Sequence, residues 1–571
     1  NQGSAKSNPV ALQYSYYTRP GVLKGYYSLA SENIPVLGTY DVIVAGGGTA
    51  GAPAAIGAAR KGAKTILLEQ LHMLGGMTTA GLITSYFHGY REGFSREVDK
   101  GILELGKGNG RQPKLKDSGE PDTKNWVKEW KAEWFRKECR KAGVVIWSDV
   151  IVCGALVDSG IVKGVIVSTP YGKGIIMANT VVDSTGSADV AIAAGAAYSY
   201  TDDNIAVQGA GLPGVNLGQN YVNTDWNFID DTDIFDMWRT FVVAKDKYDS
   251  VYDIGKLLQT RERRRVTGDF EISVLDIYNG RKYPDTVSLH LSSFDTHGFT
   301  VDPFFYIKPP SDAHTDVLAR VPLRSLLPRG LDGIVVTGLG ASAHRDAMPV
   351  IRMQPCLQTQ GYSVGILAAM AAKAKKTVRK IEVKALQKEL VKAGNLPESV
   401  LTDKDTFPPA KAEVVDALNK VTHDYERLEM IFWDKSQSIP LLTEQYTASN
   451  DPKEKLVYAI LLGLLGNGLG WKDIAAALDA VEEWDKGWNY RGMGQFGESM
   501  SHLDGMIIAL GNSKKAEALP AIHRMARKLS MGSEFSHFRA IAVACQTIGS
   551  SESAPVLASV LRMPGLAGFA L

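Results

Sequence analysis

Short apolar runs alternate with helix-like stretches near the start of the chain, as expected of a parallel sheet with crossing helices. The first run, residues 40–45, enters a glycine-rich turn at residues 46–51, and a helix-like stretch follows over about 52–61. A second run, residues 65–68, ends on the acid Glu69. The pattern predicts a strand, a tight turn, a helix and a second parallel strand.

The spacing within this unit is typical of a dinucleotide site. Gly46 permits a tight turn, Gly48 leaves room for a pyrophosphate against the backbone, and Gly51 lets the helix pack close to the sheet. The N–H groups at the helix start, around Thr49 and Ala50, favour the phosphate charge. Glu69 can accept hydrogen bonds from ribose hydroxyls, which favours FAD or NAD over NADP. The alternative is a glycine-rich turn in an enzyme without a nucleotide.

A second glycine segment, Gly75-Gly76-Met77-Thr78-Thr79, follows six residues after Glu69 (75 − 69). With it the chain resembles the FAD-dependent oxidoreductases of the glutathione-reductase type. It looks most like a bacterial FAD-dependent oxidoreductase family, some members of which are named putative xanthan lyase. The resemblance covers patches of residues 40–372 and implies that this segment runs along the pyrophosphate and under the flavin. The cofactor contacts predicted in this region are Gln70, Gly75, Gly76, Met77 and Thr78.

Two later segments also resemble parts of that family. The strand-like run that starts at Val150-Ile151 resembles the strand whose backbone meets the adenine. A further strand ends in Asp183-Ser184-Thr185-Gly186, followed by Asp189, which resembles the family's second FAD contact. Thr185, Gly186 and Asp189 are therefore predicted to bind the cofactor, although an ordinary strand–turn–helix junction would look the same.

The returning strand of the nucleotide domain is expected at residues 333–338 and a closing helix at residues 361–372. Gly338 and Gly361 are the cofactor contacts predicted there. The resemblance implies that His344 and Arg352 border the flavin and that the helix start lies near the pyrimidine end of the ring. One departure is Tyr362, where the family often has Gln.

Residues 206–320 are predicted to face the substrate. They contain the basic run Arg261–Arg265, from which we select Arg264 as a candidate clamp for an anionic or hydroxylated group, against a solvated charged face. Asp295 and His297 are spaced so that the acid could poise the imidazole as a general base, against a surface turn. A GxGxxG match at residues 209–214 follows no apolar strand and contains a proline, so we expect a loop there and a single dinucleotide site.

Trp126, Trp130 and Trp134 recur at helical spacing and fall on one face of a helix expected over residues 126–141. The prediction is a core stripe. A platform on which a sugar ring stacks is the alternative.

Bulk composition narrows the function classes. The chain has 571 residues, a net charge of +1, 45% hydrophobic residues and 22% charged residues, which is the composition of a globular protein with two or three domains. The charge gives no case for nucleic acid or an anionic membrane. No apolar run is long enough for a membrane span. The four cysteines are scattered, so neither a metal site nor a dithiol redox centre is predicted.

The predicted fold class is α/β, a Rossmann-like FAD-binding domain with an inserted α+β substrate domain and a C-terminal all-α domain. Residues 511–525 recur 38 positions later (549 − 511), which predicts a helical repeat of the HEAT type. Homo-oligomer or protein-partner contacts are assigned to this domain. Because the chain starts at Asn1 and its first nine residues are polar, a periplasmic or secreted location is slightly favoured over the cytoplasm. The predicted boundaries are 1–39 for an N-terminal extension, 40–205 with 321–375 for the FAD domain, 206–320 for the substrate domain and 376–571 for the helical domain.

The function expected from these features is hydride transfer between FAD and a small polar substrate, a carbohydrate or a hydroxy acid. His344 and His297 are the candidate bases, and Arg352 and Arg264 the candidate clamps. The first alternative is a flavin-binding scaffold whose helices bind a partner with little turnover. The second keeps the fold but replaces FAD by NAD.

Overall fold

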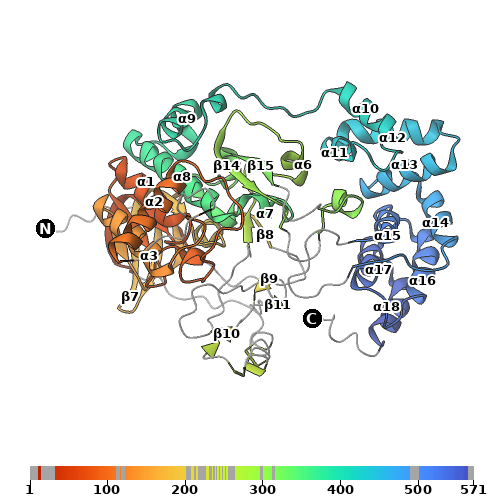
Figure 1. The fold of residues 1–571 in the computed structure, drawn as a ribbon, viewed down its shortest axis with the longest axis horizontal. Helices are drawn as coiled ribbons and strands as arrows, with labels where there is room; N and C mark the ends of the chain where they lie inside the picture. The colour runs from red at the N-terminus through yellow and green to blue at the C-terminus, as the bar shows by residue number, and fades with distance from the viewer. Residues whose placement is uncertain are drawn as a thin grey trace. The chain divides into compact units, whose positions relative to one another are not determined.

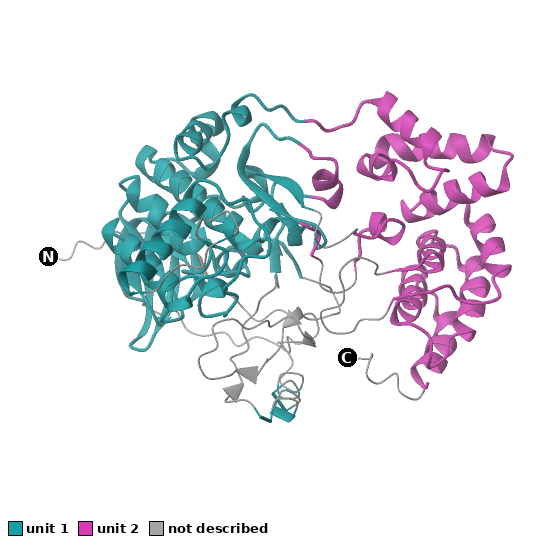
Figure 2. Ribbon diagram, in the orientation of Figure 1, with its two compact units in different colours: residues 1–272, 282–292, 316–405 teal, residues 273–281, 293–315, 406–571 magenta. Residues whose placement is uncertain are grey.

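The computed structural model describes residues 33–110, 122–200, 264–295, 300–310, 316–488 and 500–563, with Lys116, residues 11–14 and short pieces between 207 and 254. The chain divides into two compact units (Figure 2). Unit 1 comprises residues 1–272, 282–292 and 316–405, and unit 2 comprises residues 273–281, 293–315 and 406–571. The predicted four-part division stays a prediction, and residues 376–405 belong to unit 1 rather than to the unit that contains the C-terminal helices.

Unit 1 is built on a parallel sheet, which confirms the α/β class. Its parallel strands lie in the order β4, β3, β2, β7, β16. In register, Val44 of β2 lies between Leu67 of β3 and Val182 of β7. Both faces of β2 are buried near its end, as expected of a parallel strand covered on both sides. The bounds are β2 (Val36–Ala45), β3 (Thr65–Leu68), β4 (Val145–Trp147), β7 (Gly172–Asp183) and β16 (Ile334–Val336).

One face of this sheet packs against an antiparallel meander. The meander consists of β5 (Ile151–Asp158), β6 (Ile161–Thr169) and the first half of β7, and β1 (Ala11–Tyr14) pairs with β5 at its edge. Ile43 and Ala45 on β2 share one buried core with Val165 and Val167 on β6.

The other face carries helices α1 (Gly51–Arg60) and α8 (Gln354–Ala374), which pack on β2 and on each other (Figure 1). A Cβ built on Gly361 would lie 2.0 Å from the carbonyl oxygen of Ala50, and one on Gly365 would lie 2.0 Å from that of Ala54. The two helices therefore run parallel at a separation that only glycine permits. Helices α2 (Phe94–Gly108) and α3 (Lys128–Lys141) complete this layer.

Shorter elements extend unit 1 beyond the sheet. Gly209 and Ala210 belong to β9, so the loop predicted at 209–214 is partly wrong. These elements are η1 (Gly76–Thr78), α4 (Asp189–Ala193), β8 (Tyr198–Tyr200), β9 (Val207–Ala210), β10 (Gly214–Val215), β11 (Asn227–Ile229), β12 (Asp253–Ile254), β13 (Arg264–Val266), β14 (Thr286–Ser292), β15 (Val317–Pro322), η3 (Leu323–Ser325), η4 (Gly338–Gly340), α7 (Met348–Ile351), η5 (Val378–Lys380), α9 (Val383–Lys392) and η6 (Glu398–Leu401).

Unit 2 is helical in its described part. Two successive sets of helix, 3-10 turn and helix end the chain, and their turns begin at Ala516 and Ser551. The offset in the structure is therefore 35 residues (551 − 516), not 38, and the helical repeat stays a prediction. The elements are α6 (Val274–Tyr278), η2 (Pro303–Tyr306), α10 (Lys411–Lys420), α11 (Leu428–Trp433), α12 (Lys435–Ala448), α13 (Pro452–Leu464), α14 (Trp471–Asp479), α15 (His502–Asn512), η7 (Ala516–Ala518), α16 (Leu519–Arg527), α17 (Phe535–Ile548), η8 (Ser551–Ser553) and α18 (Ala554–Leu561).

The tryptophan stripe belongs to the interior of unit 1. Trp126 and Trp134 are buried, and the ring of Trp134 lies 6.0 Å from that of Phe94. Trp126 precedes α3, and its indole N–H donates to the carbonyl of Thr78 at 2.8 Å. The core interpretation is confirmed for Trp134, whereas Trp126 is buried but also lines a small pocket. The helix begins two residues later than predicted (128 − 126).

Candidate functional site

The glycine turn at the end of β2 has the geometry that its spacing predicts. Gly46 has φ +90°, and a Cβ there would lie 2.3 Å from the carbonyl oxygen of Ser184. A Cβ on Gly51 would lie 1.8 Å from the carbonyl oxygen of Gly46. A Cβ on Gly48, by contrast, would meet nothing nearer than the Cα of Gly76 at 3.9 Å. Gly46 and Gly51 are therefore required by the protein's own packing, whereas Gly48 faces open space.

The second glycine segment lies directly against the first. The N–H of Gly75 donates to the carbonyl of Gly47 at 2.9 Å, and the hydroxyl of Thr49 donates to the carbonyl of Gly75 at 3.1 Å. Gly75 and Gly76 have φ of +104° and +56°, and so take the left-handed conformation that favours glycine. The two glycine segments, residues 46–51 and 75–76, are thus separate in sequence but adjacent in space. We refer to the surface that their backbones form as the cradle.

Helix α1 presents an uncapped N-terminus to this cradle. Its N-cap Ala50 makes no side-chain cap, and its first turn contains no acidic residue. The first N–H groups of a helix have no partner within the helix and carry a partial positive charge. Such a terminus can bind a phosphate group.

Glu69 closes one side of the cradle at the end of β3. Its carboxylate accepts from the N–H of Gly47 at 2.6 Å and from the N–H of Leu71 at 2.8 Å. Burial raises the pKa of this carboxyl, and the backbone hydrogen bonds act in the opposite direction. Glu69 thus sits where the sequence expects the ribose acid, next to an exposed Gln70. Val150, which donates its N–H to the Glu69 carbonyl, is buried, and Ile151 is exposed.

The turn after β7 is held by a fully buried carboxylate. Asp183 accepts from the hydroxyl of Thr185 at 2.7 Å and from the N–H of Ala191 at 2.9 Å. Burial raises its pKa to about 6. Ala188 has φ +53°, and the N–H of Asp189 donates to the hydroxyl of Thr185. The predicted contacts Thr185, Gly186 and Asp189 are therefore placed by Asp183, which was not itself among the predicted site residues.

Arg264 is engaged inside the protein. Its guanidinium is buried, forms an ion pair with Asp189 and lies 5.9 Å from the ring centroid of Tyr198. The neighbouring Arg265 donates to the carbonyl of Ala343 at 3.0 Å. The part of the basic run that the structure describes therefore links the turn after β7 to the segment before His344. A clamp role for Arg264 toward substrate stays a prediction.

The turn after β16 also lies next to the start of α1. Gly338 has φ +76°, and a Cβ there would lie 4.0 Å from the Cβ of Ala50. The carboxamide oxygen of Gln360 accepts from the hydroxyl of Thr337 at 2.7 Å and from the N–H of Gly338 at 2.9 Å. Helix α8 thus fixes this turn through Gln360, while Gly361 serves the contact with α1.

Gln360 leads to a histidine that the sequence analysis missed. The Nε2 of His290 lies 3.4 Å from the Nε2 of Gln360 and 3.0 Å from the hydroxyl of Ser288. Complete burial lowers the pKa of His290 to about 3, so the ring is neutral at ordinary pH. In the sequence His290 occupies one of the polar positions of the alternating stretch that became β14, and the burial of both faces of that strand was not predicted.

His344 and Arg352 lie between β16 and α8. The N–H of His344 donates to the carbonyl of Ile272 at 2.8 Å, and its Nδ1 accepts from the N–H of Asp346 at 3.2 Å. An accepting Nδ1 places the proton of the neutral ring on Nε2, which can then donate. Arg352 is buried and ends the segment before α8. His297 lies outside the described residues, and its neighbour Asp295 is buried.

The residues present fit a dinucleotide. Three features support this fit. A Cβ on Gly48 would meet nothing nearer than 3.9 Å, the start of α1 is uncapped and can bind an anion, and the carboxylate of Glu69 can accept from a hydroxyl. Gly48, Thr49 and Gly76 would lie against the pyrophosphate. The N–H groups of Gly46 and Gly75 already donate to the carbonyls of Leu68 and Gly47, so these two glycines would shape the cradle.

Within the described ranges, no group of three or more His, Cys, Asp or Glu could hold a metal ion. The four cysteines are free thiols. Among the described helices, none is both long and apolar enough to span a bilayer.

A sequence model of the family described as FAD dependent oxidoreductase matches residues 41–249 and 229–390. No protein of curated function matches the chain in sequence. The chain is similar in structure to a geranylgeranyl bacteriochlorophyll reductase-like protein from Thermoplasma acidophilum, at 14% identity over 72% of this chain and 97% of that chain, with a TM-score of 0.30. It is also similar to the OxyS anhydrotetracycline hydroxylase from Streptomyces rimosus, at 14% identity over 75% and 76%, with a TM-score of 0.33. A 3-ketosteroid-delta4-(5alpha)-dehydrogenase from Rhodococcus jostii RHA1 matches at 15% identity over 59% and 97%, with a TM-score of 0.27.

Proposed function

The chain belongs to the FAD dependent oxidoreductase family, and on that premise we propose that it transfers hydride between FAD and a small polar substrate, a carbohydrate or a hydroxy acid. The observation that carries the proposal is the cradle, where the backbones of Gly48 and Gly76 lie side by side at the uncapped start of α1. FAD, when bound, supplies a two-electron hydride acceptor or donor.

The protein's part in this reaction is orientation and proton handling. His344 would donate a hydrogen bond from Nε2 to a substrate oxygen, because its Nδ1 accepts from the N–H of Asp346. In both directions this hydrogen bond would stabilise negative charge that develops on the oxygen while the ring keeps its proton, and the proton that accompanies the hydride would be exchanged with a separate base. Arg352 would orient an anionic or hydroxylated group. His297 remains the second candidate base.

Flavin bleaching without oxygen tests the proposal. The purified protein is mixed anaerobically with a panel of sugars, polyols and hydroxy acids, and the blue absorption band is followed. Loss of the band with at least one member supports the proposal. Bleaching by none of the panel, with the flavin still reducible by dithionite, favours the scaffold alternative.

His344→Ala tests the residue assignment. We expect retained FAD and a fall in the rate of flavin reduction of about 10²–10³, the usual cost of losing one hydrogen-bond donor to a developing oxyanion. His72→Ala is the control, because His72 is exposed. An unchanged rate in His344→Ala would remove this residue from the mechanism.

A further inference from the structure

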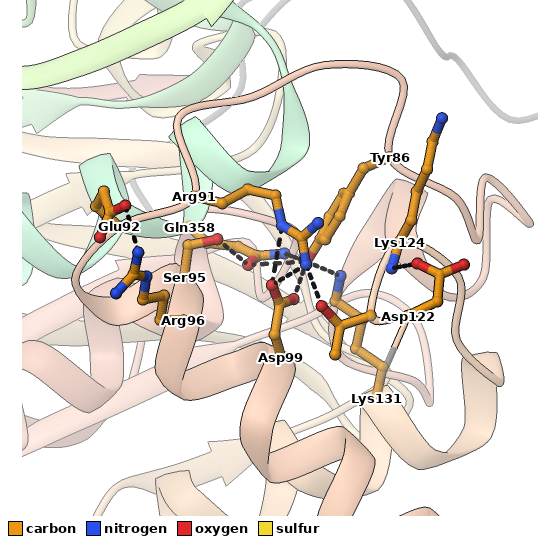
Figure 3. Close-up of polar contacts among 11 residues, drawn as sticks. Tyr86, Arg91, Glu92, Ser95, Arg96, Asp99, Asp122, Lys124, Lys131 and Gln358 are labelled. Atoms are coloured by element: carbon orange, nitrogen blue, oxygen red, sulfur yellow. Dashed lines mark hydrogen bonds and ion pairs between the residues drawn. The ribbon is translucent and has the colours of Figure 1, made fainter. Parts of the chain in front are cut away.

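A buried polar cluster ties α2, α3 and α8 together (Figure 3). The carboxylate of Asp99 accepts from the hydroxyl of Tyr86 at 2.9 Å and from Arg91 Nε at 3.0 Å. Lys131, which has no exposed surface, donates from Nζ to the same Tyr86 hydroxyl at 3.2 Å. The Gln358 carboxamide lies 3.3 Å from that hydroxyl as well. We refer to these five residues as the Lys131 cluster.

The contacts between helices α1, α2 and α8 place the Lys131 cluster toward the start of α1, where the cradle lies. Gly361 of α8 is level with Ala50 at the start of α1, so the residues of α8 before Gly361 extend beyond that start. Helix α2 runs opposite to α8, since Phe94 stacks on Tyr362 at 4.3 Å while Ser95 reaches Gln358. The later part of α2 therefore also extends beyond the start of α1, in the direction of the cradle.

A pocket of about 110 Å³ adjoins the cluster at this end of α2. A cavity needs about 10–15 Å³ of such volume to hold one water, so the pocket has room for several waters or a ligand of three or four carbons. It is lined by Asp99, Ile102, Leu103, Gly106, Asp122, Thr123, Asn125, Trp126, Val127 and Trp130.

The pocket adjoins the cofactor-binding segment through hydrogen bonds. Trp126 donates its indole N–H to the carbonyl of Thr78, one residue after Met77. The backbone N–H of Trp126 donates to the carbonyl of Thr84 at 3.2 Å. The same residue thus forms a wall of the pocket and supports the second glycine segment.

The charges around the pocket select the class of ligand. The carboxylates of Asp99 and Asp122 repel an anion. A cation is disfavoured too, because Arg91 already pairs with Asp99 and the Lys131 Nζ lies 3.5 Å from the ring centroid of Trp126. Burial raises the pKa of Asp99 and lowers that of Lys131 well below its usual value, so a charge added here would be poorly solvated. Because an anion and a cation are both disfavoured, the class of ligand that fits these polar groups is a neutral molecule with many hydroxyls.

We propose that this pocket binds a neutral polyol of three or four carbons, or the matching edge of a larger sugar. The Trp126 and Trp130 rings cover its C–H surface, and the oxygens of Asp99, Asp122 and Asn125 accept from its hydroxyls. Carboxylates accept up to four hydrogen bonds, so Asp99 keeps capacity beyond its contacts with Tyr86 and Arg91. As an account of substrate, this inference rests on the proposed function, but binding can be measured without turnover.

Calorimetric titration of the FAD-loaded protein with erythritol tests this pocket. We expect saturable binding that weakens about five- to tenfold in Asn125→Ala, from one lost hydrogen-bond acceptor, and more in Trp130→Ala. Asn125 is exposed, so its substitution leaves folding intact even if Trp130→Ala does not. Lys124→Ala is the matched control, because Lys124 is on the same segment and does not line the pocket.

The outcomes separate the pocket from the reaction. Erythritol binding that depends on Asn125 but causes no bleaching supports the pocket and leaves the substrate elsewhere. Bleaching by a sugar with the erythritol affinity unchanged in Asn125→Ala and Trp130→Ala overturns the pocket while supporting the proposed function. Absence of erythritol binding, or tighter binding of succinate or choline than of erythritol, also overturns it.

Discussion

At the scale of single residues, the glycines of the cradle do different jobs. Gly51 is required because its hydrogen faces the carbonyl oxygen of Gly46, where a Cβ would lie at 1.8 Å. Gly48 has no such neighbour. The glycine motif predicts both positions from sequence, but only the packing shows which glycine serves the fold and which the ligand.

Substitution of these two glycines separates stability from cofactor binding. We expect Gly51→Ala to lower the free energy of unfolding by on the order of 1–3 kcal/mol or more, from forced overlap. Gly48→Ala should leave the stability of the FAD-free protein nearly unchanged and weaken FAD at least tenfold, because the methyl group enters the cradle. Urea unfolding and FAD titration measure the two effects.

Gly108→Ala is the control for both, since a Cβ there meets nothing within 4 Å. FAD affinity unaffected by Gly48→Ala would show that the pyrophosphate does not lie against this residue.

Asp183 makes the stability of the protein depend on pH. Its pKa is raised to about 6 in the folded state, so ionisation is disfavoured there relative to the unfolded chain. Its contribution to stability is therefore fully present below about pH 4 and is lost as the pH rises through about 6. The total change is about 3 kcal/mol, since each pKa unit corresponds to about 1.4 kcal/mol.

Asp183→Asn removes this titration. The difference in unfolding free energy between wild type and variant should decrease by about 3 kcal/mol between pH 4 and pH 7, as measured by urea unfolding across that range. A difference that stays constant with pH would mean that Asp183 keeps its ordinary pKa in the protein.

At the scale of elements, the unit around the glycine turn was predicted closely. Strand β3 matches its prediction to the residue and helix α1 within one residue at each end, whereas β2 begins four residues earlier than predicted (40 − 36) and β16 is shorter than predicted. The sequence predicts helix α8 only from Gly361, but the helix begins at Gln354. Its first two turns were missed because they are rich in polar residues and contain a proline, a composition typical of a loop. Those turns carry Gln358 and Gln360, which explains why two of the polar groups near the cradle were missed.

The Lys131 cluster was also not predicted from the sequence. A lysine flanked by tryptophans and glutamates on a helix is expected to be solvated, and nothing local predicts that Lys131 is buried. Its burial depends on Tyr86 and Asp99, which come from separate segments. A site assembled from three elements leaves no fixed spacing to recognise.

We expect substitutions of Asp99 and of Lys131 to change the free energy of unfolding by unequal amounts. Asp99→Asn leaves Arg91 without its ion-pair partner and Lys131 without a nearby negative charge, and should cost about 3 kcal/mol of unfolding free energy. Lys131→Met keeps the volume and removes a charge that burial already disfavours, so it should change stability by less than about 1 kcal/mol or raise it. Urea unfolding of both variants compares them directly.

A Lys131→Met variant that loses as much stability as Asp99→Asn would mean that Lys131 is a required ionic partner of Asp99. The pocket would then be charged, and its preference for a neutral ligand would have to be withdrawn.

At the scale of the whole molecule, the chain has two compact units (Figure 2), and the cradle lies entirely within unit 1. Unit 2 has polar anchors of its own, such as the buried pair of His537 Nδ1 and Asp504 at 2.8 Å. Burial opposes protonation of His537, but Asp504 and its other acidic neighbours outweigh it and raise the pKa. The family match ends at residue 390, before the helices of unit 2 that begin with α10 at Lys411.

FAD should therefore stabilise the two units unequally. At a free concentration of 100 times its Kd, a ligand adds about 2.7 kcal/mol to the unit that binds it. Calorimetry with and without added FAD should show one part of the unfolding transition moved to higher temperature and another unmoved. His537→Ala should lower the unmoved part. A single transition that shifts as a whole with FAD would indicate one cooperative unit.

The central claim is that this chain holds one FAD in the cradle formed by Gly48 and Gly76. The most direct test is the absorption spectrum of the purified full chain, supplied with FAD and then desalted, followed by denaturation and quantification of the released cofactor. We predict a yellow protein that absorbs in the near-UV and blue and releases one FAD per chain, and a Gly48→Ala variant that is colourless after the same treatment. A wild-type protein that stays colourless, or that releases NAD in place of FAD, would contradict the account.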